Sequence, residues 1–320
     1  MKYYLKDIAK IKNGKKTILE DVGVKVYGSN GVIGFSKDSN APRNSIIIGR
    51  VGANTGSVFF SDEEHWVTDN AISVVPNNKI NPIYLFYLLK QKKLNRLAEG
   101  SAQPLVNQKI LNSFLIDIPS LEIQNKIADK LYKIDKKIEI NNKINTNLNS
   151  LLECVFNNYY HHKNDTVSTK LELIKMPGKY RYIGATSVND YIAKYNFDGI
   201  YLLLGEDGTV QDINGYPVLQ YIHGKFWPNN HAHVLQGNKV STEWLYLFFL
   251  QRNIEGIITG AVQKKISQKN LNSLSVTMPN NEELSKFDNI IQPIFEQIRT
   301  LEEENERLLE IKKELLTNLF

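Results

Sequence analysis

The stretch GSAQPLVNQKILNS, residues 100–113, returns in altered form as GAVQKKISQKNLNS, residues 260–273. Both copies keep a leading glycine, a glutamine three positions later and the run Gln-Lys-x-Leu-Asn-Ser. A shift of 160 positions extends this alignment without a gap from residues 66–119 to residues 226–279, with 14 identities in 54 positions. Similarity at a fixed shift indicates one structural unit used twice. We therefore expect two similar domains in this chain of 320 residues.

Each copy has the pattern of a small α+β domain. In the first copy, β-rich runs between glycines predict strands at residues 46–48, 58–60, 71–75 and 114–118. An amphipathic stretch at residues 5–11 predicts a short helix before them, and Pro82 opens a helix predicted over residues 83–97. The second copy predicts strands at residues 200–204, 232–235 and 274–278 and a helix at residues 242–258. We expect an α+β fold with a twisted, β-rich sheet and one substantial helix in each domain.

A long segment with apolar residues at alternating steps of three and four follows each copy, and such a seam requires a partner helix. The seam positions are Ile127, Leu131, Ile134, Ile138, Asn145 and Leu148 in the first segment, and Ile294, Ile298, Leu301, Asn305, Leu308 and Leu315 in the second. Both segments leave their domains at equivalent points, so an antiparallel coiled coil with pseudo-twofold symmetry is the simplest arrangement. Asn145 and Asn305 are equivalent under the shift; they either meet as a buried polar layer or point to solvent.

The expected division of the chain is a first domain at residues 1–120, a first helix at 121–156, a second domain at 157–280 and a second helix at 281–320. About 33 helical residues at about 1.5 Å each span about 50 Å, which exceeds one turn of B-DNA at about 34–36 Å. Two domains held at opposite ends of such a rod would contact two DNA segments at least one turn apart.

The positive charge is concentrated in the two domains. The net charge is +5; residues 1–160 carry 22 basic and 15 acidic side chains, and residues 161–320 carry 17 and 19. Within the second half, residues 282–314 hold ten acids and five bases. Basic domains are typical of a protein with a polyanionic partner, although proteins that never bind DNA also have them.

Several functional classes are excluded or disfavoured by what the sequence lacks. Cys154 is the only cysteine, which excludes an internal disulfide and a cysteine-based zinc site. His223, His231 and His233 with Asp212 fit no common zinc spacing, so we expect no metal site. The start has no signal-peptide pattern and no apolar run approaches a membrane span, which predicts a cytoplasmic location.

Two catalytic motifs, one for methyl transfer and one for ATP binding, are missing as well. No Pro-Pro dipeptide occurs, so the Asn/Asp-Pro-Pro-aromatic loop of an adenine methyltransferase is absent. None of the three Gly-Lys pairs is followed by Ser or Thr, so the chain has no P-loop for ATP.

A run of short motifs marks the junction between the first domain and its helix. GSAQP at residues 100–104 is followed by Asn107 and Leu111, then by IDIPSLEIQ at residues 116–124 and the helix with Ile127 and Leu131. Further phrases are TDNA at 68–71, YIGATS at 182–187, YNFDG at 195–199 and LLGEDG at 203–208. Together they resemble the specificity subunits of Type I restriction-modification systems. The second copy departs from the family pattern at Ala261 and at the start of its helix.

The resemblance implies a non-catalytic subunit that recognises DNA in defence against foreign DNA. Two inverted target recognition domains would each read one half of a bipartite DNA target, while the helices set the gap and dock two methyltransferase subunits. Restriction subunits would join in the full complex. S-adenosylmethionine, ATP and Mg²⁺ would belong to those partners, with no cofactor in this chain. Two alternatives stay open: a stand-alone DNA-binding regulator, and a coiled-coil scaffold whose domains bind protein.

Polar side chains in glycine-flanked loops are the candidates for DNA contact, because loops can enter a groove while Lys and Arg bind phosphates. In the first domain the candidates are Lys15, Lys16, Tyr27, Ser29, Asn30, Arg50, Asn54, Thr55 and Gln103. In the second domain they are Lys179, Arg181, Tyr182, Thr186, Ser187, Glu206, Asp207, Gln263, Lys264 and Lys265. The alternatives are ordinary surface turns, a tight hairpin at residues 205–208, where Glu206 and Asp207 would otherwise accept from cytosine, and a backbone-capping role for the repeated glutamine.

Overall fold

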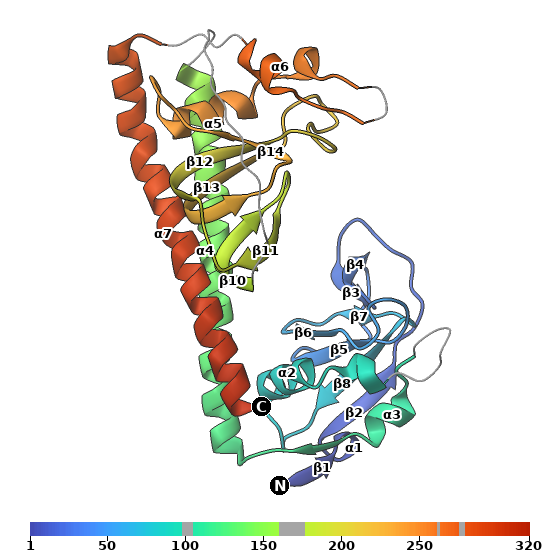
Figure 1. Cartoon of the computed structure of the whole chain (residues 1–320). Helices are drawn as coiled ribbons and strands as arrows, with labels where there is room; N and C mark the ends of the chain where they lie inside the picture. Colours follow the sequence, from blue (N-terminus) through green and yellow to red (C-terminus); the bar gives the residue numbers. More distant parts are fainter. Residues whose placement is uncertain (98–104, 160–176, 261–262, 275–278) are drawn as a thin grey trace. The chain divides into compact units, whose positions relative to one another are not determined.

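The computed structural model describes residues 1–97, 105–159, 177–260, 263–274 and 279–320 (Figure 1). The chain divides into two compact units, one made of residues 1–140 with 305–320 and the other of residues 141–304. Both units are α+β, as expected. Two long helices, α4 (Leu121–Tyr159) and α7 (Asn281–Leu319), contribute to both units and begin where the heptad-like segments begin.

The first unit contains three sheets. A two-stranded sheet pairs β1 (Lys2–Tyr4) with β9 (Leu115–Asp117). An antiparallel sheet has the order β2 (Ala9–Asn13), β8 (Ala71–Pro76), β5 (Ser45–Gly49) and β6 (Val58–Ser61). The third sheet has the order β4 (Gly31–Ser36), β3 (Val24–Gly28) and β7 (Trp66–Val67). The helical segments are α1 (Leu5–Ile8), α2 (Pro82–Gln91), the 3₁₀ turn η1 (Leu94–Leu97) and α3 (Gln108–Asn112).

Strand β5 shows why the core of the first unit has two sides. All five of its residues are buried, and successive side chains of a strand point to opposite faces. Ile46 and Ile48 therefore join the larger core beneath α2, whereas Ile47 packs on the opposite side with Tyr27 and Val67. A strand covered on both faces reads as a continuous apolar run, which is the Ile-Ile-Ile of the sequence.

The second unit repeats this plan in one five-stranded sheet. Its order is β11 (Val188–Ile192), β10 (Pro177–Ile183), β13 (Leu219–Pro228), β12 (Phe197–Gly205) and β14 (Ala232–Leu235). Its helical segments are α5 (Thr242–Leu250), η2 (Glu255–Ile257) and α6 (Gln268–Asn272). Leu202 and Leu204 of β12 face the core around Trp244, and Leu203 faces the opposite side. This is the same alternation that β5 shows in the first unit.

Three predicted helices were too long. The stretch at residues 5–11 is helical only to Ile8, because Ala9–Asn13 pairs with β8 as strand β2. The helix predicted over residues 83–97 ends at Gln91, where Lys93 takes a positive φ of 47° before η1. The helix predicted over residues 242–258 ends at Leu250. In both later cases the chain bends so that a residue beyond the break, Leu94 or Ile254, enters the core. The strand predicted at residues 274–278 lies almost wholly outside the described residues.

Helices α4 and α7 pack antiparallel within each unit (Figure 1). In the second unit, Asn141 Nδ2 donates to Glu304 Oε2 at 2.7 Å, while the rings of Phe156 and Phe287 lie 5.7 Å apart. Residue numbers therefore rise along α4 as they fall along α7. In the first unit, Asp135 of α4 forms an ion pair with Lys312 of α7. Every seam residue expected from the sequence is buried or half-buried.

One polar contact in the seam is that of Asn141 with Glu304, a pairing that the sequence did not predict. Asn145 is half-buried, and its Oδ1 atom is buried without a hydrogen-bond partner among the described residues. A meeting of Asn145 with Asn305 stays a prediction.

A buried polar network joins α5 and β13 to α7 in the second unit. The Glu243 side chain is buried, at 4 % exposure, and its carboxylate lies 3.0 Å from Arg299 Nη1. The Tyr221 hydroxyl donates to Glu243 Oε1 at 2.8 Å, and Gln292 Nε2 donates to Oε2 at 3.2 Å. Burial, followed by the nearby Glu243 charge, raises the pKa of the Tyr221 hydroxyl. Each polar group of the network thus has a partner, which is the condition for burying a charge.

Replacing Arg299 with Met should lower the free energy of unfolding by about 3 kcal/mol, because it leaves the Glu243 carboxylate buried without its cation. The matched control is Lys286→Met on the same helix, since Lys286 pairs with Glu282 in an exposed i,i+4 contact of 2.6 Å. That change should cost at most about 0.5 kcal/mol. Urea unfolding followed by circular dichroism measures both, and equal losses would contradict the assignment of the network.

Candidate nucleic-acid interface

Three loops of the first unit converge, and we call them the first loop cluster: the β3–β4 turn at residues 28–31, the loop at residues 49–57 and the turn at residues 68–71. The Ser29 hydroxyl donates to the Asn70 carbonyl at 2.5 Å and accepts from the Val51 backbone N–H at 3.3 Å. The Arg50 backbone N–H also donates to the Asn70 carbonyl, at 3.0 Å. Loops far apart in the sequence are thereby fixed beside one another.

Lys15 and Lys16 are exposed beside this cluster. The Lys15 backbone N–H donates to the Val67 carbonyl at 2.9 Å, and the Trp66 indole donates to the Lys15 carbonyl at 2.7 Å. The backbone is therefore held at the edge of β7 while both ammonium groups are left in solvent. Exposed lysines on a fixed backbone suit contact with phosphates.

The other candidates of the first unit differ in exposure. Asn30 is exposed, and Asn54 and Arg50 are half-buried; Arg50 Nη1 donates weakly to the Asp69 carbonyl, at 3.4 Å. Tyr27 is buried, and its ring packs edge-to-face with the His65 ring, with 5.2 Å between the ring centroids. Thr55 is also buried, and its hydroxyl donates to the Gly52 carbonyl at 2.7 Å. Burial favours a structural role for Tyr27 and Thr55 over base contact. Gln103 lies outside the described residues.

The second loop cluster consists of the turn at residues 184–187, the loop at residues 205–208 and residues 263–265. The Gly184 N–H donates to the Ser187 carbonyl at 2.7 Å, and the Gly208 N–H donates to the Lys264 carbonyl at 3.1 Å. A Cβ at Gly205 would lie 3.7 Å from the Ala185 Cβ, so these loops adjoin. Residues 205–208 open a longer loop, because β13 begins only at Leu219; the tight-hairpin alternative is therefore wrong.

Exposure also separates the candidates of the second unit. The exposed ones are Lys179, Thr186, Ser187, Gln263, Lys264 and Lys265. Tyr182 is buried, and the half-buried Arg181 donates to the His223 carbonyl inside the unit. Glu206 is 3 % exposed and lies 3.3 Å from Lys265 Nζ, which favours a structural role over accepting from cytosine. Asp207 lies 2.9 Å from Nδ1 of His231.

The sequence-based list of DNA-contact candidates omitted the turn at residues 68–71, which was noted only as a family motif, and His231, which was noted only as a sheet or DNA-facing polar residue. The turn is the hub of the first loop cluster because the Asn70 carbonyl accepts from both Ser29 and Arg50. About half of the His231 side chain is exposed, and its Nδ1 atom lies 2.9 Å from the Asp207 carboxylate. The signal for the turn was its place just before a buried strand; the pairing of His231 with Asp207 left no signal in the spacing.

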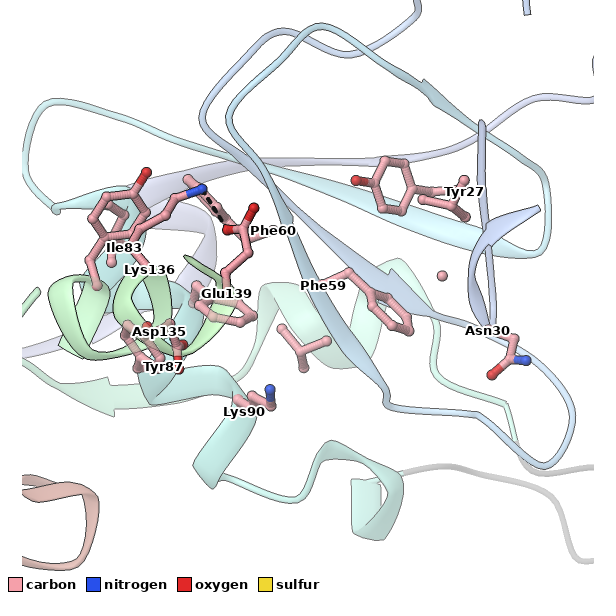
Figure 2. Close-up of a pocket in the computed structure, with 15 residues that line it drawn as sticks. Tyr27, Asn30, Phe59, Phe60, Ile83, Tyr87, Lys90, Asp135, Lys136 and Glu139 are labelled. Atoms are coloured by element: carbon pink, nitrogen blue, oxygen red, sulfur yellow. Dashed lines mark hydrogen bonds and ion pairs between the residues drawn. The ribbon is translucent and has the colours of Figure 1, made fainter. Parts of the chain in front are cut away.

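A cleft of about 510 Å³ adjoins the first loop cluster: Tyr27, Asn30 and Gly31 contribute to its lining, and the rest comes from strands of the first unit, α2 and α4 (Figure 2). Aromatic rings form much of its wall, and its charged lining consists of Lys90, Asp135, Lys136 and Glu139. Lys136 and Glu139 pair at 3.0 Å, and the Tyr87 hydroxyl donates to Asp135 at 2.6 Å (Figure 2). Burial and this hydrogen bond raise the pKa of the Tyr87 hydroxyl. The Tyr87–Asp135 hydrogen bond holds α2 against α4, whereas Lys136 and Glu139 pair within α4.

The three histidines singled out in the sequence have separate partners. His223 Nε2 lies 2.9 Å from Glu302, His231 contacts Asp207, and His233 Nε2 lies 2.8 Å from the Ile266 carbonyl. Among the residues that the structure describes, no group of three or more His, Cys, Asp or Glu side chains could hold a metal ion. Within the same residues, no helix has the length and apolar character needed to cross a bilayer.

Comparison with known proteins supports one family. Residues 1–150 and 155–313 each match the family described as the Type I restriction modification DNA specificity domain. The Type I restriction enzyme EcoprrI specificity subunit of Escherichia coli is 33 % identical over 109 residues, covering 34 % of this chain and 27 % of that protein. The HindI specificity subunit of Haemophilus influenzae is 26 % identical over 128 residues, covering 37 % and 28 %. These matches span about a quarter of each relative.

The fold is also shared with a solved structure. The crystal structure of the Type I restriction-modification system S subunit from M. genitalium has a TM-score of 0.72 at 16 % identity, covering 100 % of this chain and 96 % of that one. The two family matches account for most of the sequence. This chain therefore belongs to the Type I restriction modification DNA specificity family.

Adjacent lysines of the second loop cluster should respond differently to substitution. Lys265→Ala removes the cation beside the buried Glu206 carboxylate and should lower the free energy of unfolding by about 1–2 kcal/mol, since half of the lysine is in solvent. Lys264→Ala removes an exposed charge with no ion pair in the described part of the chain and should change it by less than about 0.5 kcal/mol. Thermal unfolding of both variants tests the difference; a loss that is larger for Lys264→Ala would contradict the arrangement.

Proposed function

We propose that this chain is the non-catalytic, sequence-specific DNA-recognition subunit of a Type I restriction-modification complex and acts in the cytoplasm. The observation that carries the proposal is the duplication: two α+β units of the same plan, each with its own cluster of polar loops, share two long antiparallel helices. Family membership supports the same conclusion. A protein with two different recognition surfaces is suited to a DNA target with two different half-sites.

Each loop cluster reads one half of the bipartite target. Asn30, Arg50 and Asn54 of the first cluster supply donors and acceptors suited to base edges, and Lys15 and Lys16 suit phosphates. Thr186, Ser187 and Gln263 take the corresponding part in the second cluster, with Lys179 and Lys264 as phosphate contacts. The loops of the two units differ in sequence, which accounts for two unlike half-sites. The paired helices set the gap between them.

The outer face of α4 is the proposed docking surface for the methyltransferase subunits. Within the second unit, Ile144 and Leu151 lie on one face of the helix by their spacing and are 39 % and 47 % exposed. An apolar stripe in solvent beside an already closed seam suits a partner helix. Two methyltransferase subunits and, in the full complex, restriction subunits then bring S-adenosylmethionine, ATP and Mg²⁺ to the assembly. This chain supplies the recognition of the DNA sequence.

The test is reconstitution with a Type I methyltransferase subunit from the same genome. The complex should retain duplex DNA with an affinity that falls steeply with added salt and should methylate one split sequence. Exchange of residues 1–120 for the equivalent part of another family member should change one half of that sequence and leave the other half and the gap unchanged. A chain that elutes without the methyltransferase yet binds DNA alone would be a stand-alone regulator. Failure to bind duplex DNA at any salt would refute DNA recognition.

The docking surface can be tested with a matched pair of variants. Ile144→Asp places a charge within the apolar stripe and should lower methyltransferase co-elution at least tenfold, because the carboxylate would be buried at the interface. Thr146→Asp adds the same charge to a different, exposed face of α4 and should leave co-elution unchanged. Size-exclusion chromatography of the two complexes measures the outcome. Equal co-elution of both variants would place the docking surface elsewhere.

A further inference from the structure

The two units share some exposed side chains. Neither core packing nor the recognition of different DNA half-sites explains why these residues are the same in both units. The most conserved part of the repeat forms α3 in the first unit and α6 in the second, and both helices span five residues. Two units that read unlike sequences have no reason to keep the same solvent-facing residues in the same place. An identity of that kind indicates contact with something that is the same for both units.

Some identities in this repeat have a structural cause. Leu111 and Leu271 are buried in their cores. The hydroxyls of Ser113 and Ser273 donate to carbonyls at the ends of the two helices, at 3.2 Å to Lys109 and 2.7 Å to Asn270. Orphan carbonyls at a helix end need such donors. Core packing and capping therefore account for the leucine and the serine.

The lysine and the asparagine have no such cause. Lys109 and Lys269 are exposed, Asn112 is half-buried and Asn272 is exposed. Lysine and asparagine stand three residues apart, so they lie on one face of each short helix. Neither lysine forms an ion pair with any residue that the structure describes. Both units therefore present one ammonium and one amide to solvent in the same local setting.

In the first unit this pair lines a shallow hollow of about 560 Å³. Its lining is Tyr4, Lys6, Gln108, Lys109, Asn112 and Ser113. Among these described lining residues are two ammonium groups, two amides and two hydroxyls, and no carboxylate. Lys6 is also exposed, with its Nζ atom 5.5 Å from the centre of the Tyr4 ring. The Ser113 hydroxyl and the Gln108 amide already donate to backbone carbonyls, so the ammonium groups of Lys6 and Lys109 and the Asn112 amide are the main donors. A hollow with these donors and no carboxylate in its lining has the chemistry to bind an anion with several oxygen atoms.

We propose that Lys109 with Asn112, and Lys269 with Asn272, each bind a phosphate of the DNA backbone and so fix each unit in the same position relative to its half-site. This inference rests on the proposed function and names a contact within it. The backbone is the part of a duplex that does not change between two unlike half-sites, and phosphate contacts set register without specifying bases. Identical residues for an identical ligand follow directly. Lys6 adds a second cation to the first of these two phosphate sites.

The experiment measures binding of the complete complex with the methyltransferase to target and unrelated duplexes over a range of salt concentrations. Lys109→Ala should lower the slope of log K against log salt by about 0.9, and Lys109→Ala with Lys269→Ala by about 1.8. Affinity for both duplexes should fall by the same factor, roughly fivefold per site near 0.15 M salt. Lys109→Arg should restore the slope because it keeps the charge.

The matched control is Lys25→Ala, which removes the same charge from the first unit. Lys25 is paired with Glu63 at 3.1 Å, so the slope should stay unchanged. A wild-type slope in Lys109→Ala, or the same loss in Lys25→Ala, would overturn the proposal. A second result would also overturn the proposal: the variant co-elutes less with the methyltransferase, but the complex that still forms has wild-type DNA affinity. The repeated pair would then be a protein-binding surface. A wild-type complex that binds no duplex would refute the proposed function itself, and this inference with it.

Discussion

The structure depends on the closure of one apolar seam between α4 and α7. Neither helix can bury its row of isoleucines and leucines alone, and an amphipathic helix gains most of its stability from packing. Each unit therefore builds its core from three sources: its own sheet and short helices, a part of α4 and a part of α7. In the second unit, Leu152 and Phe156 of α4 join Phe287 and Ile291 of α7 in one cluster. The two loop clusters lie on units that these helices hold in shape.

The hydrophobic periodicity and the internal duplication of the sequence predicted most of the fold. The heptad-like pattern placed the starts of α4 and α7, and Ala232–Leu235 is a strand with the bounds expected of it. Helix ends were less accessible, because the bends after Gln91 and Leu250 serve the burial of Leu94 and Ile254. Local propensity favours continuing those helices, and tertiary packing stops them. The same limit applies to Ala9, which pairs in a sheet with residues far along the chain.

The sequence supplied candidate residues for DNA contact, which stay predictions, and the structure adds which loops adjoin and which side chains are exposed. The glycine-flanked segments at residues 28–31 and 49–57 do converge, yet the turn at residues 68–71 that joins them acts through the Asn70 carbonyl, which no side-chain pattern reveals. Charged residues of one loop cluster can also differ in burial: Lys264 faces solvent, while Glu206 is buried beside Lys265. A single sequence gives residue types and spacing, and burial decides which of those residues reach a partner.

The division of the chain has a consequence for the order of events at the ribosome. Residues 141–304 form a contiguous unit, whereas the first unit needs residues 305–320, including the Lys312 that pairs with Asp135 and the Phe320 ring 5.3 Å from Tyr84. At about 5–20 residues per second, synthesis from residue 140 to residue 305 takes about 8–33 seconds. During that interval part of the first core has no cover. The first unit is thus completed after the second, and it is the unit of the nascent chain that is most exposed to aggregation or chaperone capture.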